Sequence, residues 1–224
     1  MHSINSIIAL TRREFKITYR NFSSFLSIFI FFILGIIIFV FSIGINKEII
    51  NQAGIGIIWT LILLTNTLSI KKFFQDDFYD NNIIIFHISG LSYELISFIK
   101  ISIIWFFIQI PFFIILPISM LLLNIDITNI KNIFITFIIS SVIITCITAI
   151  SGSMNLLNNK NFAIGSLIIM VLSIPVIIFS VEIIKSSENL IVSQLSILLG
   201  IMFFFLAITP WVCGACIKIS VQNK

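Results

Sequence analysis

Charged side chains are scarce in this sequence, and six long stretches contain none at all. The charge-free stretches are residues 21–46, 49–70, 101–125, 132–159, 161–181 and 189–217. A helix needs about 20 mainly apolar residues to cross a hydrocarbon core of about 30 Å, and each stretch has at least 21 residues. The apolar runs are continuous rather than alternating, which excludes a β-barrel. The sequence therefore predicts an all-α integral membrane protein with six transmembrane helices.

The spans lack ionisable residues, and this absence excludes a class of transport mechanisms. None of the six stretches contains Asp, Glu, Lys, Arg or His. Ion pumps and proton-coupled carriers use such groups to move or relay charge. The chain also lacks a Gly-x-x-x-x-Gly-Lys-Ser/Thr loop, which holds the phosphates of ATP in P-loop enzymes. We therefore expect no catalytic residue in this chain, and any energy from ATP must come through another subunit.

Cysteine is rare, yet two of the three cysteines form a C-x-x-C pair, Cys213 and Cys216. Redox pairs of this kind use a thiolate that is stabilised at a helix N-terminus. This pair lies at the C-terminal end of the last span, where the helix dipole disfavours a thiolate. We favour helix packing for the pair and keep a membrane thiol oxidoreductase as an alternative.

Basic residues are distributed unevenly between the two sides of the membrane. With the N-terminus inside, ten of the thirteen Lys and Arg residues lie on the cytoplasmic side, and only Lys47, Lys131 and Lys185 lie outside. The positive-inside rule therefore predicts cytoplasmic N- and C-termini. Orientation accounts for the net charge of +4, so we expect no nucleic-acid partner.

The charge pattern divides the chain into three parts. We expect an amphipathic interfacial helix at residues 1–22, a transmembrane domain at 23–217 and a cytoplasmic tail at 218–224. The spans are predicted at about residues 23–45, 51–70, 101–123, 133–155, 162–181 and 191–217, with a cytoplasmic segment at 71–100.

Residues 1–22 combine an apolar face with a basic row. Ile8 and Phe15 belong to the apolar face, and Arg12, Lys16 and Arg20 follow one another at intervals of four. Residues four apart lie on the same side of a helix. A helix of this kind lies in the interface against anionic lipid, either as a simple topological anchor or as an elbow helix that also touches a cytoplasmic partner.

The segment at 71–100 has the strongest signal for a protein partner. Its first turns contain Phe74, Asp76, Asp77, Phe78 and Asp80. Exposed aromatic residues beside carboxylates are typical of a docking surface, although a solvated turn that leaves the membrane explains the same composition. The carboxylates are not followed by the further ligands and glycine turn of a calcium loop, so we expect no metal site.

Small residues recur every four positions in the fourth span. They are Ser141, Thr145, Ala149 and Ser153. A stripe of this kind lets a neighbouring helix approach closely, so we interpret it as a packing face.

Several of these motifs resemble those of the CcmB family. They are Arg13 to Arg20 before the first span, Gly56-Ile57-Ile58-Trp59 in the second, Phe74 to Asp80 after it, Ile174 to Phe179 in the fifth and Thr209-Pro210 near the end. The resemblance covers essentially the whole chain. One departure follows Asp80, where the Gly-x-Leu-Glu-Gln of the family pattern is replaced by Asn81-Asn82-Ile83-Ile84-Ile85.

The resemblance implies the membrane subunit of an ABC transporter of cytochrome c maturation, in a bacterial inner membrane or the corresponding organelle membrane. It implies a CcmA-like ATP-binding subunit, which docks on the segment after the second span and carries the ATP. It also implies a CcmC-like haem-handling membrane protein and a small accessory subunit. By position, Phe74, Asp77 and Asp80 are the expected coupling residues.

Haem is the ligand that the resemblance implies, either transported or handled. No span offers a His ligand, which favours ATP-driven release of a haem-loaded chaperone over passage of haem through this chain. Two other functions stay open, namely a lipid or polysaccharide exporter of the same ABC class and a passive scaffold for the haem-handling complex.

Overall fold

The computed structural model describes residues 2–44, 47–125, 130–157, 162–185 and 188–223, and these ranges form nine helices. Six of them are long: α2 (Phe22–Ile43), α3 (Lys47–Leu68), α6 (Tyr93–Leu122), α7 (Ile130–Leu157), α8 (Phe162–Lys185) and α9 (Glu188–Gln222). The other three are α1 (His2–Arg20), α4 (Lys71–Tyr79) and α5 (Asn82–Ile88).

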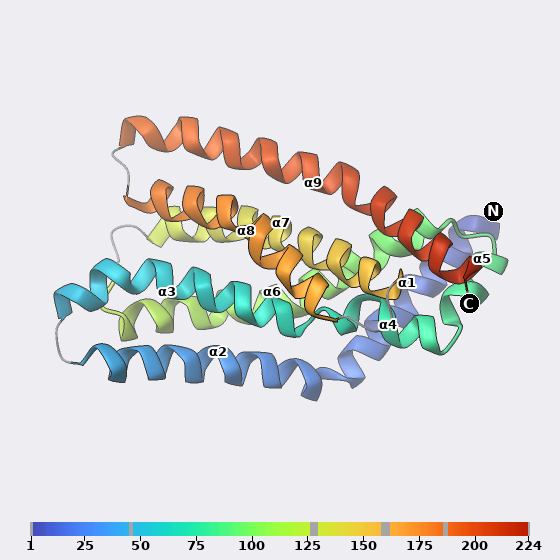
Figure 1. Ribbon diagram of the computed structural model, residues 1–224, viewed down its shortest axis with the longest axis horizontal. Helices are drawn as coiled ribbons and strands as arrows, with labels where there is room; N and C mark the ends of the chain where they lie inside the picture. The colour runs from blue at the N-terminus through green and yellow to red at the C-terminus, as the bar shows by residue number, and fades with distance from the viewer. Residues whose placement is uncertain (1, 45–46, 126–129, 158–161, 186–187, 224) are drawn as a thin grey trace.

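The long helices run side by side as one bundle, and the other three gather at one end of it (Figure 1). That end also carries both ends of the chain, and we call it the terminal end. Within the described ranges, six helices are long and apolar enough to cross a membrane. The prediction of an all-α protein with six membrane-spanning helices is therefore confirmed.

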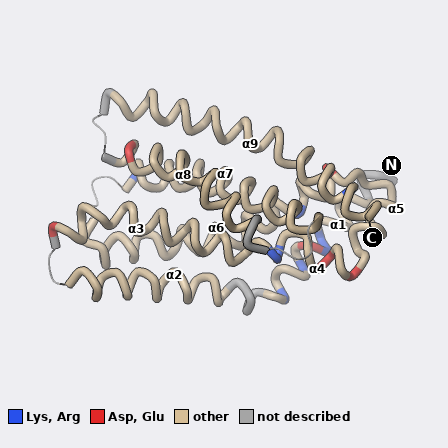
Figure 2. The backbone as a smooth tube through the Cα atoms, viewed as in Figure 1, with Lys and Arg blue, Asp and Glu red and all other residues tan. Residues whose placement is uncertain are grey.

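The boundary between α3 and α4 separates a span from a surface segment. The apolar stretch continues from Glu48 to Tyr79, but Lys71, Lys72 and Asp76 lie in α4. Charged groups are costly in hydrocarbon, so we take α3 as the span and α4 as lying outside the membrane. Figure 2 shows that charged residues gather around α1 and α4, at the terminal end.

The helix that contains the third predicted span begins before the predicted start of that span. Ser92 caps α6, because its Oγ accepts a hydrogen bond from the backbone N–H of Leu95 at 3.3 Å, and such a cap fixes the first turn of a helix. The segment predicted at 71–100 therefore overlaps this helix. Its last eight residues, including Lys100, are the first turns of α6.

Helix α7 occupies the centre of the bundle and packs mainly against α8 and α9. Its four small residues, Ser141, Thr145, Ala149 and Ser153, are all buried. Trp105 Nε1 of α6 donates to Ser141 Oγ at 3.1 Å, whereas Ser153 interacts with Cys213 of α9. The stripe predicted to receive one helix therefore faces two.

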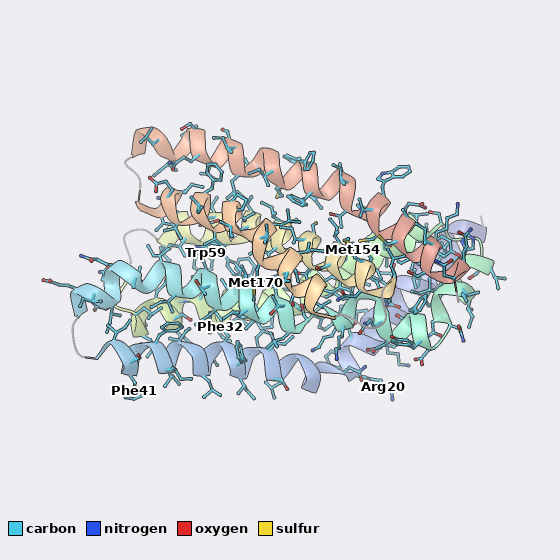
Figure 3. All side chains as sticks on the ribbon, in the orientation of Figure 1. Arg20, Phe32, Phe41, Trp59, Met154 and Met170 are labelled. Carbon is cyan, nitrogen blue, oxygen red and sulfur yellow. The ribbon has the colours of Figure 1, made fainter. Side chains whose placement is uncertain are left out.

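Polar side chains tie α3, α6 and α7 together within the bundle. Gln109 Nε2 donates to Asn66 Oδ1 at 3.3 Å and to Thr145 Oγ1 at 3.2 Å. Interhelical hydrogen bonds of this kind help hold membrane helices together. The outer helices present apolar side chains instead, and Figure 3 shows Phe41 of α2 pointing away from the bundle.

Candidate functional site

The α4–α5 hairpin rests on a buried aromatic face. Phe73, Phe74 and Phe78 of α4 are all buried, and Phe74 is only 1% exposed. Gly152 of α7 permits this close approach, because a Cβ atom there would stand 3.0 Å from the carbonyl oxygen of Ile70. The expectation that Phe74 and Phe78 are exposed for docking is therefore wrong. These two side chains fasten α4 to the bundle.

A tight turn at Asn81 reverses the chain between α4 and α5. Asn81 has φ of 59°, in the left-handed region that asparagine tolerates better than most residues. The turn leaves Tyr79 and Asp80 exposed, and α5 exposes Ile85 and Ile88, the latter by 80%. We call Tyr79, Asp80, Ile85 and Ile88 the hairpin tip.

Four charged side chains from three helices close into a ring beneath the hairpin. Arg13 Nη2 donates to Asp77 Oδ1 at 2.9 Å, and Arg13 Nη1 donates to Glu14 Oε1 at 2.5 Å. Lys100 Nζ donates to Glu14 Oε2 at 3.0 Å and also pairs with Asp77. Positive and negative groups alternate around this charge ring, so each group touches two of opposite sign. It joins α1, α4 and α6.

The charge ring is largely withdrawn from solvent. Lys100 is 2% exposed and Glu14 is 4% exposed. Burial alone would raise the pKa of Asp77, but Lys100 and Arg13 outweigh it and hold that pKa below its ordinary value. Asp77 is therefore ionised at neutral pH, and the ring carries no net charge.

Helix α5 also contributes to the ring. Asn82 Nδ2 donates to Asp77 Oδ1 at 2.9 Å, and the Arg13 guanidinium lies 4.8 Å from the centre of the Phe86 ring. A cation over an aromatic face is attracted by the ring's quadrupole. Through these two contacts, the charge ring connects both helices of the hairpin with α1 and α6.

A polar hollow of about 270 Å³ lies beside the ring and is bordered by Asn21, Lys72, Asp76 and Asp80, among others. Asp76 and Asp80 are exposed, whereas Lys72 is partly buried. Burial lowers the pKa of Lys72 to about 8, although Asp76 opposes this shift. Among the residues that the structure describes, no group of three or more His, Cys, Asp or Glu residues is arranged to hold a metal ion.

Helix α1 turns one face to the bundle and the opposite face outward. Leu10, Glu14 and Thr18 are buried against the bundle. The row of Arg12, Lys16 and Arg20, which we call the basic row, is exposed on the other side, and Figure 3 shows Arg20 where α1 meets α2. The buried face of this amphipathic helix therefore includes a carboxylate, that of Glu14.

The C-x-x-C pair lies in the second half of α9. Cys213 is buried, Cys216 is partly buried, and both thiols are free. Between them, Gly214 leaves room for Glu94 of α6, because a Cβ atom at Gly214 would stand 3.0 Å from Glu94 Cγ. Thiol exchange needs an accessible sulfur, so this geometry favours the packing interpretation.

The five predicted docking residues thus separate into three groups. Phe74 and Phe78 are buried, Asp77 belongs to the charge ring, and Asp76 and Asp80 are exposed. The sequence reasoning missed the role of Glu14 and Lys100. One signal was present, namely a single acidic residue within the basic stretch of residues 12–20.

Comparison with known proteins gives a match over nearly the whole chain. The family model described as CcmB protein matches residues 5–220. A heme exporter protein B from Haemophilus influenzae is 26% identical over 218 residues, which are 96% of this chain and 99% of that protein. Proteins of the same name from Bradyrhizobium diazoefficiens and Pseudomonas aeruginosa are 24% and 22% identical, over 96% and 97% of this chain and 98% of each relative.

Proposed function

Because the chain belongs to the CcmB protein family, we propose that it is the membrane subunit of a haem exporter that serves cytochrome c maturation. A separate CcmA-like subunit binds and hydrolyses ATP, and a CcmC-like membrane protein handles the haem. The names of the relatives support the haem part of this proposal, since each is called heme exporter protein B.

The attachment of the hairpin to the bundle supports coupling between ATP hydrolysis by the partner subunit and movement of this chain. Its tip exposes Tyr79, Asp80 and Ile88, whereas its base is fixed by Phe74 and by Asp77 in the charge ring. A partner that pushes on the tip therefore acts on the first turns of α6 through Lys100. The fixed base converts a local push into a movement of a membrane span.

Orientation follows from the basic residues. We infer that the terminal end faces the cytoplasm of a bacterial cell, with the bundle in the inner membrane. Arg12, Lys16 and Arg20 all belong to α1, which lies at this end (Figure 1). The hairpin tip then faces the compartment that contains ATP.

ATP-driven release of a haem-loaded partner is the mechanism that we favour over passage of haem through this chain. The hollow inside the bundle that is lined by Trp59 and Phe137 has a volume of only about 10 Å³, whereas ligand sites usually measure about 300–1,000 Å³. The spans offer no His ligand. Both observations support work done on a neighbouring haem-binding protein.

The decisive experiment replaces one exposed residue of the tip and compares it with a matched residue at the opposite end. Ile88→Asn alters the tip, and Ile49→Asn alters an exposed isoleucine of α3 near the far end of the bundle. We expect Ile88→Asn to reduce co-purification of the ATP-binding subunit and haem attachment to c-type cytochromes, whereas Ile49→Asn preserves both. Equal behaviour of the two variants would refute docking at the tip. Retained assembly and maturation after Asp77→Ala would favour a passive scaffold instead.

A further inference from the structure

The outer surface of α1 combines the basic row with an apolar flank. Phe15 and Tyr19, which are four residues apart, are 48% and 69% exposed. Residues four apart on a helix are neighbours, so these rings form a strip along the helix. The basic row follows the adjacent strip. Aromatic and basic side chains occur together in this way where a helix meets the surface of a bilayer.

The position of Phe15 gives the depth of α1 relative to the membrane. Its ring lies 5.0 Å from that of Phe107 and 6.5 Å from that of Phe106, measured between centroids. Phe106 follows Lys100 by six residues in α6, which is about 9 Å along a helix axis, and it is exposed on the outside of the bundle. The apolar flank of α1 therefore reaches the hydrocarbon side of the interface, and the basic row lies at headgroup level.

The basic row also lines a shallow, open groove on the surface of α1, and all the residues that line it belong to this helix. Arg12, Lys16 and Arg20 line this groove, and so does Arg13. Arg13 is at the same time a member of the charge ring, through Asp77 and Glu14. One guanidinium thus separates the outer groove from the base of the hairpin.

We propose that the groove binds the headgroups of anionic phospholipids in the inner leaflet, and that Arg13 links this binding to the position of α4. The negatively charged headgroup phosphate pairs with the basic row, and the acyl chains continue along Phe15 and Phe106. A soluble anion would satisfy the charges but would leave this apolar flank exposed to water, so the surface fits a lipid.

The test measures binding of single lipids to the full-length chain in detergent by native mass spectrometry. The probes are phosphatidylglycerol and phosphatidylcholine. Each Lys or Arg near an anionic surface contributes about 1 kcal/mol, so the double variant Arg12→Gln/Lys16→Gln should bind phosphatidylglycerol about 30-fold more weakly. Phosphatidylcholine binding should not change. The matched control is Lys131→Gln/Lys218→Gln, which removes two exposed charges elsewhere and should keep the affinity of the parent chain.

Three results would overturn the lipid site. These are equal affinities for the two lipids in the parent chain, equal losses in the double variant and its control, and competition by free glycerophosphate as strong as that by the lipid. The last result would identify a site for soluble anions.

The link to α4 has its own measurement. Phosphatidylglycerol should slow hydrogen–deuterium exchange of the α4 amides in the parent chain, and Arg13→Gln should abolish this slowing while lipid still binds through the basic row. Exchange in α4 that is insensitive to lipid in the parent chain would refute the link. Neither measurement includes the ATP-binding subunit, so failure here is distinguishable from failure of the proposed function.

Discussion

Neutralising Lys100 should destabilise the protein, and neutralising Glu14 in the same chain should add no further loss. Lys100 is almost fully buried between Glu14 and Asp77. Lys100→Met keeps most of the volume but leaves two carboxylates with Arg13 alone, and the ring acquires a net negative charge. Removal of one partner from a buried ion pair usually costs about 3–5 kcal/mol. We expect about 3 kcal/mol, because Arg13 still contacts both carboxylates.

The double variant tests whether the four charges act as one unit. Glu14→Gln alone leaves the ring with a net positive charge and should also cost about 3 kcal/mol. Lys100→Met/Glu14→Gln leaves one ion pair, Arg13 with Asp77, whose charges cancel. The double variant should therefore be no less stable than either single variant, which makes the interaction energy about 3 kcal/mol.

These differences are measured by heating the detergent-purified chain and determining the fraction that remains folded by size-exclusion chromatography. A loss of 3 kcal/mol corresponds to a fall in Tm of about 6–12 °C for a chain of this size. Lys131→Met removes an exposed lysine of α7 and should stay within about 0.5 kcal/mol of the parent chain. Additive losses in the double variant would refute the closed ring.

The other predictions concern single sites. The folded-state pKa of Asp77 is depressed, so the stabilisation by its carboxylate should be complete above the unfolded pKa of about 3.9 and should disappear as the pH falls through the lower folded value. The Tm difference between the parent chain and Asp77→Asn should therefore vanish in that acidic range. A difference that stays constant with pH would contradict this. Phe74→Ala should cost about 3–5 kcal/mol in thermal unfolding, because it leaves a cavity, whereas an exposed Phe74 would give almost no change. Gly152→Ala should cost about 1–3 kcal/mol, since its Cβ would stand 3.0 Å from the Ile70 carbonyl oxygen, and unchanged stability would mean that α4 can move away freely. Acylation of Lys72, followed by mass spectrometry, should rise with an inflection at about pH 8, and a curve without this inflection would contradict the burial of Lys72.

The six spans could be predicted because the signal for a span is local. The length and hydropathy of one stretch decide whether it crosses a membrane, and no knowledge of its neighbours is needed. The start of α6 differs because its signal is a single cap at Ser92, whereas the charges at Glu94 and Lys100 suggested that the segment before the span was still continuing.

The charge ring could not be predicted from spacing. Arg13 and Asp77 are 64 residues apart, and Glu14 and Lys100 are 86 apart, so only the packing of α1 and α4 against α6 brings them together. Positive-inside counting treats each lysine as a surface charge, and it therefore gives no reason to bury Lys100.

The aromatic residues of α4 were misread for a related reason. Phe74 and Phe78 are four residues apart and share a face, which is equally compatible with a docking surface and with a buried stripe. The deciding residue is Gly152, on a helix far along the chain, because its missing side chain lets α4 approach α7. Ile88 and Tyr79 of the hairpin tip are exposed instead, and the tip is where we propose that the partner docks.

Stability alone does not explain a buried ring of charges at this position. Well-packed apolar side chains of the same volume often stabilise a protein as well as a buried ion pair does, because desolvation offsets much of the Coulomb attraction. The stabilisation by the charge ring depends strongly on the relative positions of α1, α4 and α6, since each carboxylate contacts two cations. A shift of α4 by a few ångströms must either carry α1 and α6 along or leave Asp77 and Lys100 buried without each other. Apolar contacts would tolerate small sliding, whereas the ring penalises it at once. We therefore expect α1, α4 and the first turns of α6 to move as one body whenever a partner displaces the hairpin.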